Sequence, residues 1–210
     1  MNINHLFSPS LKLETERVAL TPVHQNEFEA FKSIIFEPDI WRFYTIKYEN
    51  MEDLNGFFER ATKDYHSRTR CAFTITDKST NTIVGSTSFG NISDRDSRLE
   101  IGWSWLCKAA RGKGINTHAK FLLLEYAFEV LKAVRVEFKT DEKNWGARKA
   151  LVKCGATEEG VLRSHTQMHS NRRRDTIFYS VLDYEWPEIK QKVFGQIKSL
   201  NNFSYEQNSE

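Results

Sequence analysis

A short segment with two glycines and two basic residues is the part of this sequence best suited to do chemistry. It reads Arg111-Gly112-Lys113-Gly114-Ile115-Asn116 and lies between a predicted strand ending in Trp105-Leu106 and a strongly apolar helix. Free backbone N–H groups at the start of a helix bind anions, helped by the positive end of its dipole. Glycines let that backbone approach a phosphate without a clash, and Arg111 and Lys113 add charge. The segment therefore predicts an anion site suited to phosphate.

Taken alone, this loop has a second interpretation, because a basic loop with glycines is more often a solvated turn. Two familiar nucleotide-binding loops are excluded. No Gly-Lys-Ser or Gly-Lys-Thr closes a Walker pattern, and Thr117 stands where a dinucleotide-binding fold has its third glycine. Both of those folds also need parallel sheets, whereas the strands before this loop are predicted to be antiparallel.

The elements that must position the loop follow from hydrophobic periodicity. Before the loop, a strand, two amphipathic helices and a three-stranded antiparallel meander are expected. In the last of these strands, Trp103 and Trp105 should share one face and Glu100 the other. After the loop, a buried helix leads directly into a strand, and such a crossover makes that strand parallel to the one before the loop. The predicted elements are strands over 11–22, 71–76, 83–92, 99–105, 134–139, 156–164 and 175–181, and helices over 28–35, 54–65, 115–132, 144–154 and 187–200.

These elements predict one α+β domain over residues 1–200, followed by a polar disordered tail over 201–210. The sheet should be mixed, mostly antiparallel and of about seven strands, with helices on both faces. The chain has 210 residues and is 40% hydrophobic, which is enough for a core. Its net charge of +2 argues against a nucleic-acid partner.

Cysteine usage and hydropathy predict a cytoplasmic protein without a membrane partner. Cys71, Cys107 and Cys154 form no C-x-x-C pair and no zinc-like group, so reduced thiols are expected. No apolar run reaches the roughly 18 residues needed to cross a bilayer. His165 and His169 lie at a strand end and in a loop without a third ligand, so no metal is predicted.

The segment 111–116 resembles the fingerprint of the GNAT superfamily of N-acetyltransferases, from which it departs at Asn116. Asn144 and Gly155 also keep the spacing of that family's later motif. The order of elements agrees over roughly residues 10–185. The segments 112–117 and 174–176 look most like the branch that contains the ribosomal-protein alanine N-acetyltransferases.

The resemblance implies an acetyl-CoA-dependent enzyme in which an amine attacks the thioester directly, in a ternary complex. Acetyl-CoA would be a co-substrate lying in a groove opened by the splay of the parallel strand pair. A backbone N–H near Trp105 or Leu106 would stabilise the oxyanion, and Asn144 would bind the pantetheine or a water. The expected cofactor-binding residues are Trp105, Leu106, Arg111, Gly112, Lys113, Gly114, Ile115, Asn116 and Asn144.

The catalytic residues are less well determined by the resemblance. Glu100 is the expected general base, although a solvated or ion-paired glutamate is an equal alternative. The positions from which relatives protonate the leaving thiolate hold Leu151 and Ala147, which carry no acid. Tyr179 and Ser180 are the remaining candidates, and simple core packing is the commoner role of a strand tyrosine.

The acceptor is expected to be a primary amine, either a protein N-terminus or a small molecule. Trp41, Tyr44 and Trp103 are candidates for its pocket, with core packing the alternative for each. The run 172–174 of three arginines is either a solvated loop face or a surface that attracts an acidic peptide. The alternative function is a non-catalytic acyl-CoA-binding or sensor protein, and a monomer or a homodimer fits equally.

Overall fold

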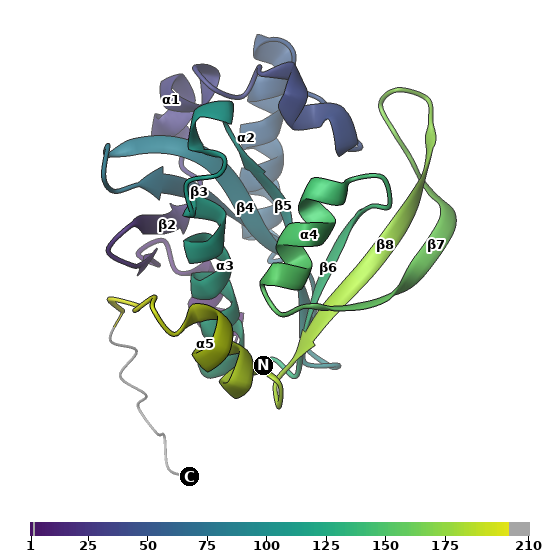
Figure 1. The fold of residues 1–210 in the computed structure, drawn as a ribbon. Helices are drawn as coiled ribbons and strands as arrows, with labels where there is room; N and C mark the ends of the chain where they lie inside the picture. Colours follow the sequence, from purple (N-terminus) through teal and green to yellow (C-terminus); the bar gives the residue numbers. More distant parts are fainter. Residues whose placement is uncertain (2, 202–210) are drawn as a thin grey trace.

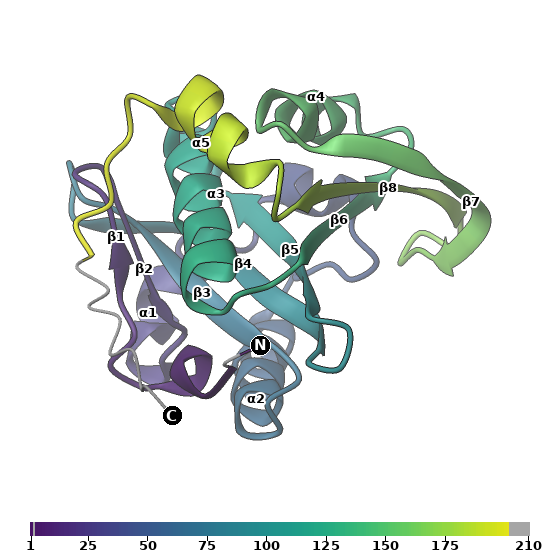
Figure 2. The same ribbon diagram turned by 90° about the horizontal axis from the view of Figure 1, so that it is seen from below.

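The computed structural model describes residues 1 and 3–201, and it is built around one mixed sheet. Eight strands follow the order β1-β2-β3-β4-β5-β6-β8-β7, and every neighbouring pair is antiparallel except β5 and β6. Helices α1 and α2 cover one face, while α3, α4 and α5 cover the other (Figures 1 and 2). The strands are β1 Leu13–Glu14, β2 Val18–Pro22, β3 Cys71–Asp77, β4 Thr82–Ser93, β5 Arg98–Leu106, β6 Arg135–Asp141, β7 Thr157–Gln167 and β8 Arg173–Leu182, and the helices are α1 Phe28–Lys32, α2 Met51–His66, α3 Ile115–Glu125, α4 Trp145–Lys153 and α5 Trp186–Phe194.

The parallel pair β5 and β6 separates soon after it forms. The two strands pair from Arg98 opposite Arg135 to Glu100 opposite Glu137, and no described pair continues beyond that point. Beyond Glu100, β5 continues toward the start of α3, while β6 turns toward α4 (Figure 1). This opening in the middle of the sheet confirms the predicted splay.

The first predicted strand, 11–22, is in fact a short hairpin, which brings the sheet to eight strands. Leu13 pairs with Leu20 across a turn at Glu16 and Arg17. The buried Thr15 hydroxyl sits in this turn and accepts hydrogen bonds from the N–H groups of Arg17 and Val18. A hydroxyl that satisfies two backbone donors stabilises a turn inside a run that alternates like a strand.

A bulge at Trp103 overturns the predicted face pattern of β5. Trp103 has a φ of +51°, and the pairing with β4 shifts between Ser86 and Ser88. Ile101 consequently packs in the core cluster that contains α3, whereas Trp105 packs in the second cluster, with α1 and α2. A bulge adds one residue and so reverses the side on which later side chains lie. A bulge in this strand is predicted from the sequence, but at Gly102, one residue before its observed position.

The main core lies between the sheet and α3, which is buried along most of its length. A single π turn, Tyr126–Val130, ends this helix. At that end Lys190 of α5 pairs with Glu125 and Glu129, at 2.9 and 2.6 Å. In the described part of the chain, no helix is long and apolar enough to span a membrane.

Several predicted boundaries differ from the structure, and the largest difference is in the closing helix predicted over 187–200, because α5 ends at Phe194. The helix predicted over 28–35 is shorter, since α1 ends at Lys32. Of the predicted tail over 201–210, residues 202–210 lie outside the described residues. Asn201 is held by the first hairpin, because its side chain donates to the Lys12 carbonyl at 2.6 Å and accepts from the Glu14 N–H at 2.7 Å.

Candidate active site

A cleft of about 630 Å³ occupies the opening between β5 and β6. At one end is the segment leading into α3, and at the other the turn Pro38–Phe43 and the β7–β8 hairpin. Ile75 of β3 lines it together with residues from six further segments, namely 39–45, 100–106, 111–120, 138–140, 144–151 and 165–174. Because the pairing of β5 and β6 stops at Glu100, the cleft reaches residues on both faces of the sheet.

The loop before α3 has the geometry of an anion site. Gly112 and Gly114 have φ angles of +74° and +81°, which a side chain would strain. A Cβ placed on either glycine would meet no described atom within 4 Å, so open space faces this backbone. The Nε of Arg111 donates to the Leu106 carbonyl at 3.0 Å, which ties the loop to the end of β5. The glycine backbone just before α3 therefore borders space that a phosphate can enter, beside the N-terminus of the helix.

Some of the predicted cofactor-binding residues line the cleft with their side chains, and the others contribute only backbone near the start of α3. Ile115 is buried in the core, and its role in this end is to anchor the first turn of α3. Gly112, Lys113 and Gly114 are exposed and do not line the cleft with side chains. Those that line it are Trp105, Leu106, Arg111, Asn116 and Asn144.

Asn144 has a structural role as the N-cap of α4. Its Oδ1 accepts a hydrogen bond from the Ala147 N–H at 3.1 Å. This cap holds the start of α4 against the cleft. The helix ends at Lys153, and Gly155 follows its C-cap with a φ of +87°, which suits this position.

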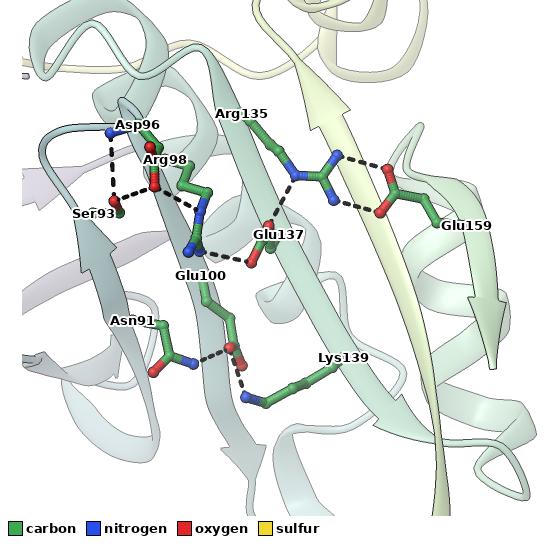
Figure 3. Close-up of polar contacts among 9 residues, drawn as sticks. All are labelled: Asn91, Ser93, Asp96, Arg98, Glu100, Arg135, Glu137, Lys139 and Glu159. Atoms are coloured by element: carbon green, nitrogen blue, oxygen red, sulfur yellow. Dashed lines mark hydrogen bonds and ion pairs between the residues drawn. The ribbon is translucent and has the colours of Figure 1, made fainter. Parts of the chain in front are cut away.

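Glu100 lies where the two strands part, and the residue is only 4% exposed. Its Oε2 accepts from Asn91 Nδ2 at 2.5 Å and pairs with Lys139 Nζ at 2.9 Å (Figure 3). The ion-paired alternative is thus present, and it coexists with a place in the lining of the cleft. Farther along the same face, Glu137 pairs with Arg98 and Arg135 (Figure 3).

The three aromatic residues predicted for the acceptor end have different surroundings. Trp41 is 3% exposed and donates its indole N–H to the Ile35 carbonyl at 2.7 Å, so it belongs to the core and does not line the cleft. Tyr44 lines the cleft and donates its hydroxyl to the Ser104 carbonyl, and burial raises the pKa of its phenol. Trp103 also lines the cleft and is 40% exposed, because the bulge turns it outward.

The side chains of the three consecutive arginines in the β7–β8 hairpin lie in three different environments. Arg172 pairs with the buried Asp141, and the exposed Arg173 donates to Ser164. Arg174 is 8% exposed and lines the cleft, where its Nε donates to Thr176 Oγ1 at 3.0 Å. The same hairpin reaches the turn Pro38–Phe43, since His169 Nε2 lies 3.0 Å from the Trp41 carbonyl. This end of the cleft is thereby closed by two segments far apart in the sequence.

Comparison with known proteins agrees with this geometry. Residues 17–157 match the family model described as an acetyltransferase (GNAT) domain. This chain belongs to the GNAT family. The probable N-acetyltransferase YjcK of Bacillus subtilis is 30% identical over 156 residues, which cover 73% of this chain and 80% of YjcK. The putative ribosomal N-acetyltransferase YdaF of the same organism is 34% identical over 104 residues, covering 50% of this chain and 56% of YdaF.

The solved structures show the same GNAT fold. The crystal structure of a putative acetyltransferase from T. thermophilus superposes with a TM-score of 0.80 and 32% identity, covering 88% of this chain and 96% of that one. The protein is therefore an acetyl-CoA-dependent N-acetyltransferase, and the predicted family and α+β architecture are confirmed. The open backbone at Gly112 and Gly114 fits the diphosphate of this co-substrate.

Tyr179 and Ser180 lie outside the GNAT cleft. The Tyr179 hydroxyl donates to Glu158 at 2.8 Å and accepts from Arg148 at 3.2 Å. Ser180 donates to Glu159 at 2.8 Å. Both hydroxyls thus contact β7, and that of Tyr179 also contacts α4, at places that do not line the cleft.

Sequence reasoning missed Lys120, which lines the cleft from α3. The residue is 5% exposed and lies in a helix whose neighbouring positions, Ala119 and Phe121, are core. A signal was available, since a lysine inside so apolar a helix interrupts its pattern. Helical spacing alone did not show it, because the polar stripe of the helix runs through His118 and Glu125 instead.

Proposed function

We propose that the protein transfers the acetyl group of acetyl-CoA to a primary amine by direct attack, with both substrates bound. The observation that carries this proposal is the continuity of one cleft from Arg111 and Asn116, which flank the glycine loop, past Glu100, to the proposed acceptor end at Tyr44 and Arg174. A single cleft lets the two substrates meet without a covalent enzyme intermediate. The described thiols agree with this, because Cys71, Cys107 and Cys154 are buried and none lines the cleft.

In this proposal the backbone of 112–116 binds the diphosphate, and Arg111 adds charge beside it. The pantetheine arm then follows β5 past Leu106 and Trp105 into the opening. A backbone N–H near Trp105 stabilises the negative charge that develops on the thioester oxygen. Asn144 has one side-chain atom committed to capping α4, which leaves its amide N–H₂ for the pantetheine or a water.

Glu100 is the proposed base. Asn91 and Lys139 both contact Oε2, and among the described residues no donor contacts Oε1. Oε1 is therefore available to accept a proton from the amine, either directly or through a water. The pair with Lys139 also orients the carboxylate, so that its geometry is set before the acceptor binds (Figure 3).

The acceptor in this proposal is a protein N-terminus or a small-molecule amine. The name of YdaF, a putative ribosomal N-acetyltransferase, supports the first class. The side chain of Arg174 supports an acceptor with an acidic group near its amine, because its Nη groups have no partner among the described residues.

The proposal is tested in two steps, neither of which requires the acceptor to be identified in advance. Isothermal titration with acetyl-CoA should show binding in the micromolar range or tighter, and absence of binding would refute it. Release of free thiol is then followed with acidic and basic N-terminal peptides, polyamines and amino sugars. Turnover with one class identifies the acceptor. Cofactor binding without turnover on any amine would favour the sensor alternative.

A further inference from the structure

Lys120 places a buried ammonium group at the point where β5 and β6 separate. Its Nζ donates to Ser104 Oγ at 2.9 Å, and Ser104 Oγ lies 2.8 Å from Thr87 Oγ1. On the other side the ammonium is 5.4 Å from the ring centre of Phe138 on β6. The group therefore spans the opening between the two strands and lines the cleft.

This lysine has no carboxylate partner in the part of the chain that the structure describes. Glu100 lies close enough to affect the pKa of Lys120, but its carboxylate is already paired with Lys139. A buried cation without an ion pair is costly, and such groups concentrate at functional sites. Burial lowers the pKa of Lys120 to about 8, with Cys154 and Glu100 opposing the shift.

Lys120 lies near the place where the proposed function puts the thioester sulfur. Its partner Ser104 stands on β5 between Glu100, the proposed base, and Trp105, beside the proposed oxyanion site. The cleft offers few other proton donors at this place. The Tyr44 hydroxyl is committed to the Ser104 carbonyl, and Lys139 is paired with Glu100. Leu151 and Ala147 also line the cleft, but they carry no proton to give.

We infer that Lys120 is a catalytic residue that protonates the departing sulfur of CoA, an inference that rests on the proposed transfer to an amine. The nitrogen lone pair of the amine forms the C–N bond, and the C–S bond breaks with its electrons on sulfur. Sulfur takes a proton from the Lys120 ammonium, which becomes a neutral amine. The proton lost by the attacking nitrogen passes to Glu100 or water, and solvent restores the proton of Lys120 when the products leave.

The test uses free CoA as the probe, so it does not depend on the acceptor. An ammonium beside the bound sulfur should favour its thiolate, and we expect the pKa of the CoA thiol to fall by about one unit or more on binding to the wild-type protein. The thiolate is followed by its ultraviolet absorbance against pH, with the protein alone subtracted. A bound thiol that titrates like free CoA would overturn the inference without the use of any variant.

Variants test whether the shift in the pKa of the CoA thiol is caused by Lys120. K120M keeps the length and apolar stem of the side chain, and it should return the bound thiol to the pKa of free CoA. K149M is the control, because Lys149 is an exposed lysine of α4 that does not line the cleft, and it should keep the wild-type shift. Equal shifts in wild type and K120M would contradict the inference. If CoA fails to bind the wild-type protein at all, the proposed function fails first.

Turnover gives a second readout once an amine is accepted. The wild-type kcat should decrease as the pH rises past about 8, because Lys120 then loses its proton. The other titratable or charged groups that line the cleft or face Lys120 are Asp39, Tyr44, Glu100, Arg111, Lys139, Cys154, His165 and Arg174. K120R keeps its charge at that pH but donates poorly, so it should lose at least about tenfold in kcat without this decrease. A K120R enzyme with wild-type kcat and pH profile would contradict the role of proton donor.

Discussion

The two ends of the cleft are built from different kinds of structure. The cofactor end comes from one contiguous stretch, 106–116, and it offers mainly backbone at Gly112, Gly114 and the start of α3. The acceptor end is assembled from side chains of segments far apart in the sequence, including 39–45 and the β7–β8 hairpin. One end is therefore a local motif, and the other is a product of the whole fold.

The two ends therefore differ in how far their amino-acid sequences can vary. A backbone site requires positive φ angles, which few residue types other than glycine adopt, so its sequence is constrained. A side-chain site requires only that loops meet, and many sequences satisfy that. We therefore expect changes at the cofactor end to affect all acceptors equally, and changes at the acceptor end to discriminate between them.

Gly114→Val should have the largest effect, because it disrupts the cofactor end directly. A β-branched residue is strained at the φ of +81° and would fill the space that faces the backbone. We expect the Kd for acetyl-CoA, measured by isothermal titration, to rise by at least about 100-fold.

The matched control is Gly160→Val on β7. Gly160 also has a positive φ, +152°, and faces open space, but it lies outside the cleft. It should lose stability without losing acetyl-CoA affinity. Equal losses of affinity in both variants would show that strain, and not the site, explains the effect.

The same contrast explains what could be predicted from the sequence. Arg111 to Asn116 predicted the cofactor end, since its chemistry depends on neighbours in the chain. Tyr44 and Trp103 were placed at the acceptor end, whereas Trp41 proved to be core, because burial depends on contacts that periodicity does not encode. Lys120 was missed for the same reason. The bulge at Trp103 was expected one residue too early, since alternation cannot locate an inserted residue.

Glu100→Gln comes next, because Glu100 lies at the junction of the two ends. Loss of the base should lower kcat/KM by about 100-fold for every accepted amine, with little change in acetyl-CoA affinity. The defect should shrink at higher pH, where more of the amine is already neutral. Glu137→Gln is the control from the same polar row, and it should keep most of the activity (Figure 3). An unchanged pH–rate profile in the Glu100 variant would remove Glu100 as the base.

Arg174→Met should act only at the acceptor end. This change removes a buried charge while keeping much of the side-chain volume. We expect kcat/KM to drop by about tenfold for acidic peptides and to change little for polyamines. The exposed Arg173 is the control, and Arg173→Met should not discriminate. A uniform loss across both amine classes would assign Arg174 to the fold or to the cofactor end instead.

Substitution of His118 should give the smallest effect. It tests which contacts hold the start of α3 in place and does not test binding of the co-substrate. Thr15 Oγ1 accepts from the N–H groups of Arg17 and Val18, so its own proton points to His118 Nδ1, 2.9 Å away. The bond needs a neutral ring as acceptor. Burial, helped by Arg17 and opposed by Glu16, lowers the pKa of His118.

The sign of the pH effect follows from this shift. Because the folded pKa lies below the unfolded value of about 6.5, the unfolded chain binds the proton more readily. The stability is therefore complete above that pH and declines as the pH falls through it. Between about pH 8 and about pH 5.5, we expect Tm to fall about 2–4 °C further in wild type than in His118→Gln. His66→Gln, at the exposed end of α2, should keep the wild-type decline. If wild type and His118→Gln decline equally, the first turn of α3 is held without any contribution from the neutral ring.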